Sequence, residues 1–393
     1  MKGVALPLAL TFAVQALASM AMIAPSVMAP VAAAELGVSA QGIGWFVTLE
    51  YFFAMASGLI CGALIGGFGA VRVCQMSVCL AAAGLAAGTA AVLALVFVAA
   101  GLIGCGYGLV NPVSSHILAS AAPPRMMSLI FSIKQTGVPV GGALAGILVP
   151  PLVLALSWRW SAVTVALLCV CVALLIQPAR SADAAAPQRT GAGSAADFLA
   201  PIAMVLASPP VLELALVSMI FGSAQLALIA YYVSYLNLEL GYSLITAGLI
   251  YSCAHAAGIV GRIAWGAVAD RWLTPRSMLG LLGAMMALSG AGVAGFSAHW
   301  PLWGIIVVSA LFGASAVGWN GVYLAEVARL APPGRVGAIT GGTQFFTFIG
   351  ALAAPPLFGF VVGLAGSYGK AYLAFCLLPA LAATRLLISA RRA

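Results

Sequence analysis

The sequence predicts an all-α membrane protein with twelve transmembrane helices in two parallel six-helix repeats. Three observations predict this fold class: the composition, the number of long apolar runs and an internal repeat. Of the 393 residues, 64% are hydrophobic and only 6% are charged, whereas soluble domains carry about 25% charged residues. A soluble fold could not bury this much apolar surface, so the composition indicates a chain surrounded by lipid.

Twelve apolar runs are long enough to cross a hydrocarbon core of about 30 Å. They cover approximately residues 6–34, 40–66, 72–92, 94–120, 126–150, 158–177, 211–236, 243–269, 276–297, 301–328, 335–364 and 367–388. The first run follows Lys2 and ends near Ala32-Ala33-Ala34, like a signal peptide. It exceeds the 7–15 residues typical of a signal-peptide core, so we expect it to be retained as a helix.

Two halves of the chain resemble each other. Glu35-Leu36-Gly37 returns 204 positions later as Glu239-Leu240-Gly241. Farther on, Asn111, Pro123-Pro124 and Gln135 return 209 positions later as Asn320, Pro332-Pro333 and Gln344. A polar stretch separates the halves, which predicts an N-terminal six-helix bundle over 1–178, a cytoplasmic linker over 179–205 and a C-terminal bundle over 206–393.

The positive charges predict the orientation of the chain. With both termini inside, ten basic residues lie at cytoplasmic loops or ends, and only Arg159 and Lys370 lie outside. Because cytoplasmic loops are enriched in Lys and Arg, we expect a multi-pass protein of the cell inner (cytoplasmic) membrane with both termini cytoplasmic. The ten are Lys2, Arg72, Arg125, Arg180, Arg189, Arg271, Arg276, Arg335, Arg391 and Arg392.

Two short motifs resemble those of a known family. Residues 266–272 read Gly-Ala-Val-Ala-Asp-Arg-Trp and are followed by Arg276, while Gly261-Arg262 stands just upstream. This loop resembles the signature loop of the major facilitator superfamily, although its first-half counterpart has Gly66 and Gly67 in place of the acid and the base. Residues 137–142 resemble the family's glycine-proline element. The resemblance covers the whole chain and implies a twelve-helix secondary transporter that works by alternating access.

The loop also contains a group of charged residues that we predict to act in gating. Asp270 lies at the inner end of a helix, and Arg262, Arg271 and Arg276 are near it in sequence. Such a cluster is able to latch the two halves in one conformation and must break in the other. The alternative is that these charges only set the topology.

Three ionisable residues are expected within the membrane. Lys134 lies about eight residues, hence about 12 Å, into the fifth helix, where a lysine is costly and should face a cavity or a partner. We interpret it as an anion-binding group; the alternative is a structural pair with Glu50 or a helix carbonyl. Glu50 and His255 are candidates for proton coupling, and a neutral histidine bonded to a neighbouring helix is the alternative for the latter.

Uncharged polar residues at membrane depth complete the predicted substrate site. They are Gln135, Asn111, Asn320, Gln344 and Tyr231. Each of the amides either lines the cavity or bonds another helix, and aromatic residues in helices more often serve packing. Glu326 and Arg329, three residues apart, are predicted to form a local ion pair.

Several function classes are excluded by what the sequence lacks. No nucleotide-binding loop, nucleophile-base-acid set or metal-ligand cluster is recognisable, and no basic stretch carries interleaved aromatics. We therefore expect no enzyme activity, no cofactor and no nucleic-acid partner. The leading hypothesis is a monomeric, proton-coupled or facilitated carrier of a small organic anion. The alternatives are a proton-antiporting exporter of drugs or amphipathic metabolites, and a non-transporting membrane receptor or assembly factor.

Overall fold

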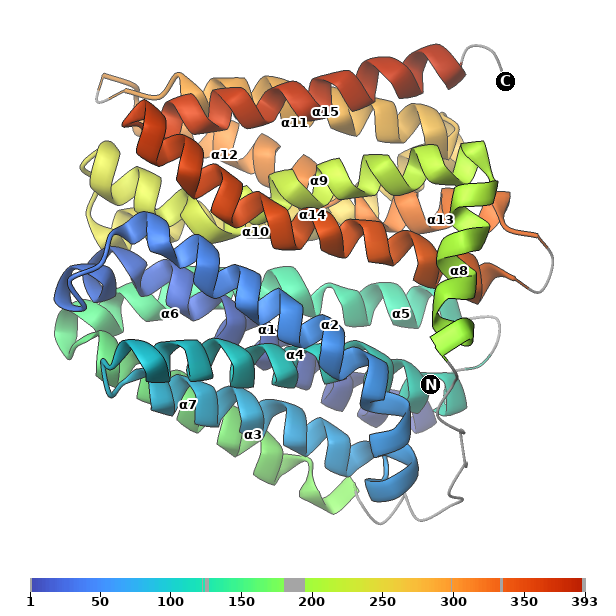
Figure 1. Ribbon diagram of the computed structural model, residues 1–393, viewed down its shortest axis with the longest axis horizontal. Helices are drawn as coiled ribbons and strands as arrows, with labels where there is room; N and C mark the ends of the chain where they lie inside the picture. Colours follow the sequence, from blue (N-terminus) through green and yellow to red (C-terminus); the bar gives the residue numbers. More distant parts are fainter. Residues whose placement is uncertain are drawn as a thin grey trace. The chain divides into compact units, whose positions relative to one another are not determined.

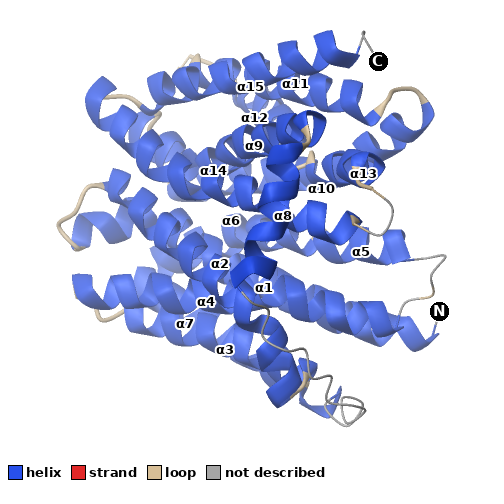
Figure 2. Ribbon diagram, turned by 45° about the vertical axis from the view of Figure 1, so that its right-hand side comes forward, coloured by secondary structure: helices blue, strands red, loops and turns tan. Residues whose placement is uncertain are grey.

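The structure is a computed structural model that describes residues 2–121, 123, 127–179, 195–297, 299–332 and 335–390. Within these ranges every regular element is a helix and no strand occurs (Figure 2). Twelve helical segments in the described residues are long and apolar enough to cross a membrane. The predicted fold class, an all-α protein with twelve transmembrane helices, is therefore confirmed.

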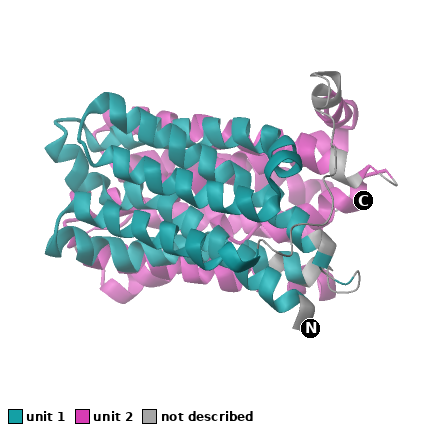
Figure 3. Cartoon of the chain, turned by 90° about the horizontal axis from the view of Figure 1, so that it is seen from below, with its two compact units in different colours: residues 1–192 teal, residues 193–393 magenta. Residues whose placement is uncertain are grey.

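The chain forms two compact units, Met1–Ala192 and Gly193–Ala393 (Figure 3). The predicted linker at 179–205 lies largely outside the described residues. Its last part is not extended chain: Ala195–Ala207 forms a helix, α8, that belongs to the second unit.

The described residues of the first unit form seven α-helices, with a short 3-10 helix between the first two (Figure 1). In chain order they are α1 (Lys2–Glu35), η1 (Ala40–Gly42), α2 (Ile43–Phe68), α3 (Ala70–Gly88), α4 (Leu93–Ala121), α5 (Met127–Gln135), α6 (Gly137–Ala155) and α7 (Trp158–Leu175). The single helix expected over 126–150 is thus interrupted at Thr136. The interruption fits Pro139, whose ring nitrogen has no hydrogen to donate to the Gln135 carbonyl four residues earlier.

The second unit follows a similar plan but adds α8 and is interrupted in a different membrane segment. Its elements are α8, α9 (Pro209–Ser234), η4 (Tyr235–Glu239), α10 (Leu244–Arg271), α11 (Pro275–Ala294), α12 (Leu302–Ala316), α13 (Asn320–Leu330), α14 (Val336–Ala365) and α15 (Tyr368–Ala390). Here the interrupted membrane segment is the tenth, broken at residues 317–319 between α12 and α13. The eleventh, which corresponds to α5 and α6, is the continuous α14.

Glycines let pairs of helices pack backbone against backbone, and they do so at repeat-related positions. A Cβ built on Gly104 of α4 would lie 2.2 Å from the Glu50 carbonyl oxygen of α2. A Cβ on Gly313 of α12 would lie 2.0 Å from the Ala254 carbonyl oxygen of α10. These two pairs of positions are related by the two offsets of the sequence repeat. The repeat is therefore a repeat of three-dimensional contacts, made possible by small residues at the interface.

The repeated glutamates also perform related tasks. Glu35, at the end of α1, accepts hydrogen bonds from the side chains of Trp158 and Arg159 at the start of α7. Glu239 accepts them from the Tyr368 and Gly369 backbone N–H groups at the start of α15. In each unit a glutamate thus joins the first membrane helix to the N-terminus of the last, where a negative charge is stabilised.

Candidate functional site

The first unit brings two predicted substrate-binding residues together. Lys134 lies in the last turn of α5, next to the break at Thr136, and is only 2% exposed. Its ammonium donates a hydrogen bond of 2.5 Å to the amide oxygen of Asn111 on α4. Gln135 follows it and is partly buried. The end of α5 thus brings the buried Lys134 ammonium to the amide of Asn111 on α4.

A third polar side chain comes to this point from α1. Gln15 is fully buried, and its amide nitrogen donates to the Ser19 hydroxyl at 3.2 Å. Its amide oxygen is buried without a hydrogen-bond partner in the described part of the chain. A Cβ on Gly137, the first residue of α6, would lie 2.9 Å from the Gln15 side chain. The sequence marks Gln15 as polar at membrane depth but gives no reason to assign it to the site.

Glu50 is a separate buried acid. It is 0% exposed, and neither carboxyl oxygen has a hydrogen-bond partner among the described residues. The alternative in which Glu50 neutralises Lys134 is therefore not what the structure shows. Burying an ionised carboxylate without a partner costs several kcal/mol. This group thus needs a proton or an approaching cation, as its predicted role in proton coupling requires.

His255 occupies a different environment in the second unit. Its ring is 1% exposed, its Nδ1 lies 3.2 Å from the Tyr251 carbonyl oxygen, and its ring centroid lies 4.3 Å from that of Tyr251. All these contacts come from its own helix, α10. The placement favours a structural histidine, and proton coupling by His255 stays a prediction.

Polar groups of the second unit gather where α9, α13 and α14 meet. The Trp319 indole N–H donates to the Gln225 amide oxygen at 3.2 Å, just before Asn320 opens α13. The Thr347 hydroxyl donates to Ser218 at 2.8 Å and lies 3.4 Å from the amide oxygen of Gln344. Gln344 thus belongs to a hydroxyl–amide group on α9 and α14, and Asn320 follows Trp319 in the chain. The sequence repeat relates Asn320 and Gln344 to Asn111 and Gln135.

Tyr231 lies elsewhere, in a closed aromatic core. It is 0% exposed, it stacks on Phe358 with centroids 4.7 Å apart, and its hydroxyl donates to the Pro355 carbonyl at 2.7 Å. Its one hydroxyl proton is therefore already bound. This placement favours the packing alternative over the predicted contact with substrate.

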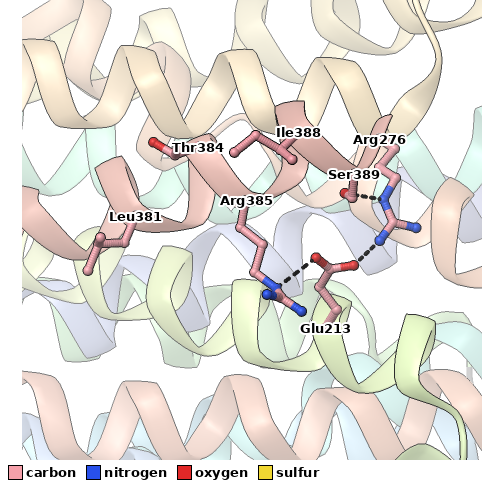
Figure 4. A pocket seen from close by; sticks show the side chains of 7 residues that line it. All are labelled: Glu213, Arg276, Leu381, Thr384, Arg385, Ile388 and Ser389. Atoms are coloured by element: carbon pink, nitrogen blue, oxygen red, sulfur yellow. Dashed lines mark hydrogen bonds and ion pairs between the residues drawn. The ribbon is translucent and has the colours of Figure 1, made fainter. Parts of the chain in front are cut away.

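The four predicted gating residues do not form the single cluster that was expected. Asp270 is exposed at the end of α10 and has no ion pair within 4 Å in the part of the chain described. Arg271 lies over the ring of Trp272. Arg276 binds Glu213 on α9 (Figure 4), because the start of α11 faces α9 and α15. A role of Asp270 in gating stays a prediction.

Comparison with known proteins decides the family. The family model of the Major Facilitator Superfamily matches residues 11–389. The chain belongs to this superfamily. A hexuronate transporter of Bacillus subtilis (strain 168) is 23% identical over 284 residues, which cover 69% of this chain and 67% of that protein.

Solved structures of superfamily transporters share the fold. A bacterial homologue of the human lysosomal transporter Spinster superposes with a TM-score of 0.77 at 14% identity, covering 98% of this chain and 96% of that one. The D-xylose–proton symporter gives 0.75 at 16% identity, covering 97% and 96%. The protein is therefore a multi-pass major facilitator transporter of small molecules.

Arg262, the remaining gating candidate of this transporter, supports the broken tenth segment. A helix end leaves backbone carbonyls without partners. The Arg262 Nε donates to the Val317 carbonyl at 3.0 Å, and the Trp265 indole N–H donates to the Ala314 carbonyl at 2.8 Å. At the repeat position of Arg262 the first unit has Gly58, where α4 is continuous. The arginine thus accompanies the break, and Trp265 is a contributor that sequence reasoning missed.

Within the described residues no group of three or more His, Cys, Asp or Glu side chains could hold a metal ion. The described polar groups of this transporter are side-chain amides, hydroxyls and single charges rather than a metal-binding set. Such an arrangement suits reversible binding of a small solute by hydrogen bonds and charge.

Proposed function

We propose that this transporter carries a small organic anion across the cell inner membrane by alternating access. The observation that supports this most is the buried Lys134 ammonium beside the Asn111 amide. An ammonium next to a neutral amide offers N–H donors to a carboxylate, and charge-assisted hydrogen bonds of this kind are about twice as strong as neutral ones. The hexuronate transporter among its relatives is named for a carboxylate sugar, which is the same class of solute.

Glu50 is the proposed proton carrier. Its buried carboxyl group lacks a hydrogen-bond partner among the described residues, so binding and releasing a proton changes its energy strongly. The D-xylose–proton symporter, which shares the fold, is named for proton coupling. We include in this proposal a topology with both termini cytoplasmic and a gating role for Asp270.

The test is uptake of a radiolabelled hexuronate into proteoliposomes, with and without an imposed pH gradient. A desolvated charge-assisted hydrogen bond contributes about 1.5–3 kcal/mol. Lys134→Gln should therefore weaken substrate binding roughly ten- to a hundredfold. Lys134→Arg should keep part of the affinity, because the charge survives while the geometry changes. The exposed Lys370 on α15 offers the matched control, and Lys370→Gln should leave affinity unchanged.

Glu50→Gln tests the coupling separately. It should abolish accumulation driven by the pH gradient but leave exchange of labelled for unlabelled substrate intact. If Lys134→Gln binds substrate with full affinity, the proposal that Lys134 forms an anion site is refuted. Proton release on adding an amphipathic drug, with no hexuronate uptake, would favour the exporter instead.

A further inference from the structure

The second unit has a charged pocket that the proposed transport site does not use. It is an open pocket of about 640 Å³ at one end of α9, α11 and α15. Glu213 stands near the start of α9, Arg276 is the second residue of α11, and Arg385 and Ser389 lie in the last turns of α15. The N-terminal ends of α9 and α11 and the C-terminal end of α15 therefore meet at this pocket, which we call the Glu213 pocket (Figure 4).

The Glu213 pocket carries an excess of one positive charge. Figure 4 shows the Glu213 carboxylate between two guanidinium groups. Arg276 binds one carboxylate oxygen, and the Arg385 Nε lies 3.0 Å from the other. Two cations thus share one anion, which leaves the pocket able to accept a further negative group.

The two arginines differ in how firmly they are held. Arg276 is 13% exposed and fixed from two sides, since its Nε also donates to the Ser389 hydroxyl at 3.0 Å. Arg385 is 77% exposed, and only its Nε is engaged within the described residues. The two terminal NH₂ groups of Arg385 are therefore available as a donor pair, next to a positive charge that is already in place.

Apolar side chains border the charged end of the pocket. Leu381 and Ile388 line it and are 67% and 49% exposed. Leu377, one turn before Leu381 on α15, is 61% exposed. We take these exposed side chains to face acyl chains, because lipid tails are as apolar as leucine. The pocket thus lies where charged groups meet lipid tails, which suits a ligand with an anionic head and an apolar tail.

We propose that the Glu213 pocket binds the phosphate headgroup of an anionic phospholipid, with an acyl chain along Leu381 and Leu377. Guanidinium groups match phosphate oxygens with paired, parallel hydrogen bonds. Basic pockets between transmembrane helices are a recurring site for anionic headgroups. The bound lipid contacts α9, α11 and α15 from the lipid-facing side of the helices. Its phosphate neutralises the one net positive charge of the two arginines and the glutamate.

The test compares dioleoylphosphatidylglycerol with dioleoylphosphatidylcholine, added to the purified transporter in a non-ionic detergent. Bound lipids are counted by native mass spectrometry, and the melting temperature is followed in parallel. Phosphatidylglycerol should bind more tightly and raise the melting temperature. Arg385→Ala should weaken phosphatidylglycerol binding about fivefold, as expected for one arginine at a membrane surface, without changing phosphatidylcholine binding. Arg276 remains on Glu213 in this variant, so the fold should persist.

Lys370→Ala is the matched control, because Lys370 is an exposed cation at the opposite end of α15. It should leave phosphatidylglycerol binding unchanged. Equal affinity for the two lipids, or an equal loss in Lys370→Ala and Arg385→Ala, would overturn the proposal. Displacement of phosphatidylglycerol by inorganic phosphate at matching concentration would assign the pocket to a soluble anion and would equally overturn it.

Discussion

Arg262 and Trp265 of α10 support the break in the tenth membrane segment, so replacing either side chain should destabilise the protein. Ala314 and Val317 at the break are only 9% and 1% exposed, so water is a poor substitute for the partners of their carbonyls. Trp265→Phe keeps an aromatic ring but removes the N–H that binds Ala314. Hydrogen bonds between membrane helices contribute about 0.6 and at most about 1.7 kcal/mol, and this is the expected loss.

Arg262→Gln should cost more, because its hydrogen bond to Val317 is charge-assisted and such bonds contribute about 1.5–3 kcal/mol. The assay is the free energy of unfolding from denaturant titration of the purified protein in mixed micelles. The double variant should cost less than the sum of the singles, since both side chains stabilise one break.

Trp272, the residue that follows α10, provides the control. It is 72% exposed, so Trp272→Phe should change the free energy of unfolding by no more than about 0.5 kcal/mol. If Arg262→Gln unfolds like the native protein, or if Trp272→Phe costs as much as Trp265→Phe, the support of the break by α10 is refuted. If Arg262→Gln loses transport while its stability is unchanged, Arg262 acts in gating and not in support of the break.

Three further predictions follow from the fold and its charges. Gly104→Ala should destabilise by about 1–3 kcal/mol, because its Cβ would lie 2.2 Å from the Glu50 carbonyl oxygen; Gly67→Ala, with nothing within 4 Å, should not lower the melting temperature. Asp270→Asn should leave stability unchanged but reduce transport and shift spin-label distances between cytoplasmic loops, and unchanged transport would make it a surface charge. A reporter fused after Ala393 should read cytoplasmic, and an external reading would reverse the proposed orientation.

The fold was predictable because the sequence alone shows both the length of the apolar runs and the internal repeat. Local pairs were predictable too: Glu326 and Arg329 form the expected ion pair, with Nε and Oε2 2.7 Å apart, since three residues bring side chains to one helix face. The break at Thr136 has a local cause in Pro139. Lys134 and Asn111 were each predictable as site candidates, but their contact was not. Local sequence does not determine which helices pack against each other.

The break at 317–319 could not be predicted, because residues 316–320 contain no proline. Its support comes from Arg262, 55 positions earlier. Likewise, sequence proximity suggested a cluster of Arg276 with Asp270, whereas Arg276 binds a carboxylate far away in the sequence. Its carboxylate partner, Glu213, is 63 positions away. Partners brought together by tertiary packing alone leave no signal in a single sequence.

The backbone contact between Gly104 and residue 50 has a consequence for how the two halves diverged. The contact uses the carbonyl of residue 50, as its counterpart uses the carbonyl of residue 254. Only glycine fits at position 104, because a Cβ there would clash with the carbonyl of residue 50. The side chain of the residue that supplies the carbonyl takes no part in the contact. That position is therefore free to differ between the halves, and it carries a carboxyl group in one half and a methyl group in the other. A repeated backbone contact of this kind permits different chemistry in the two halves without a change in their packing.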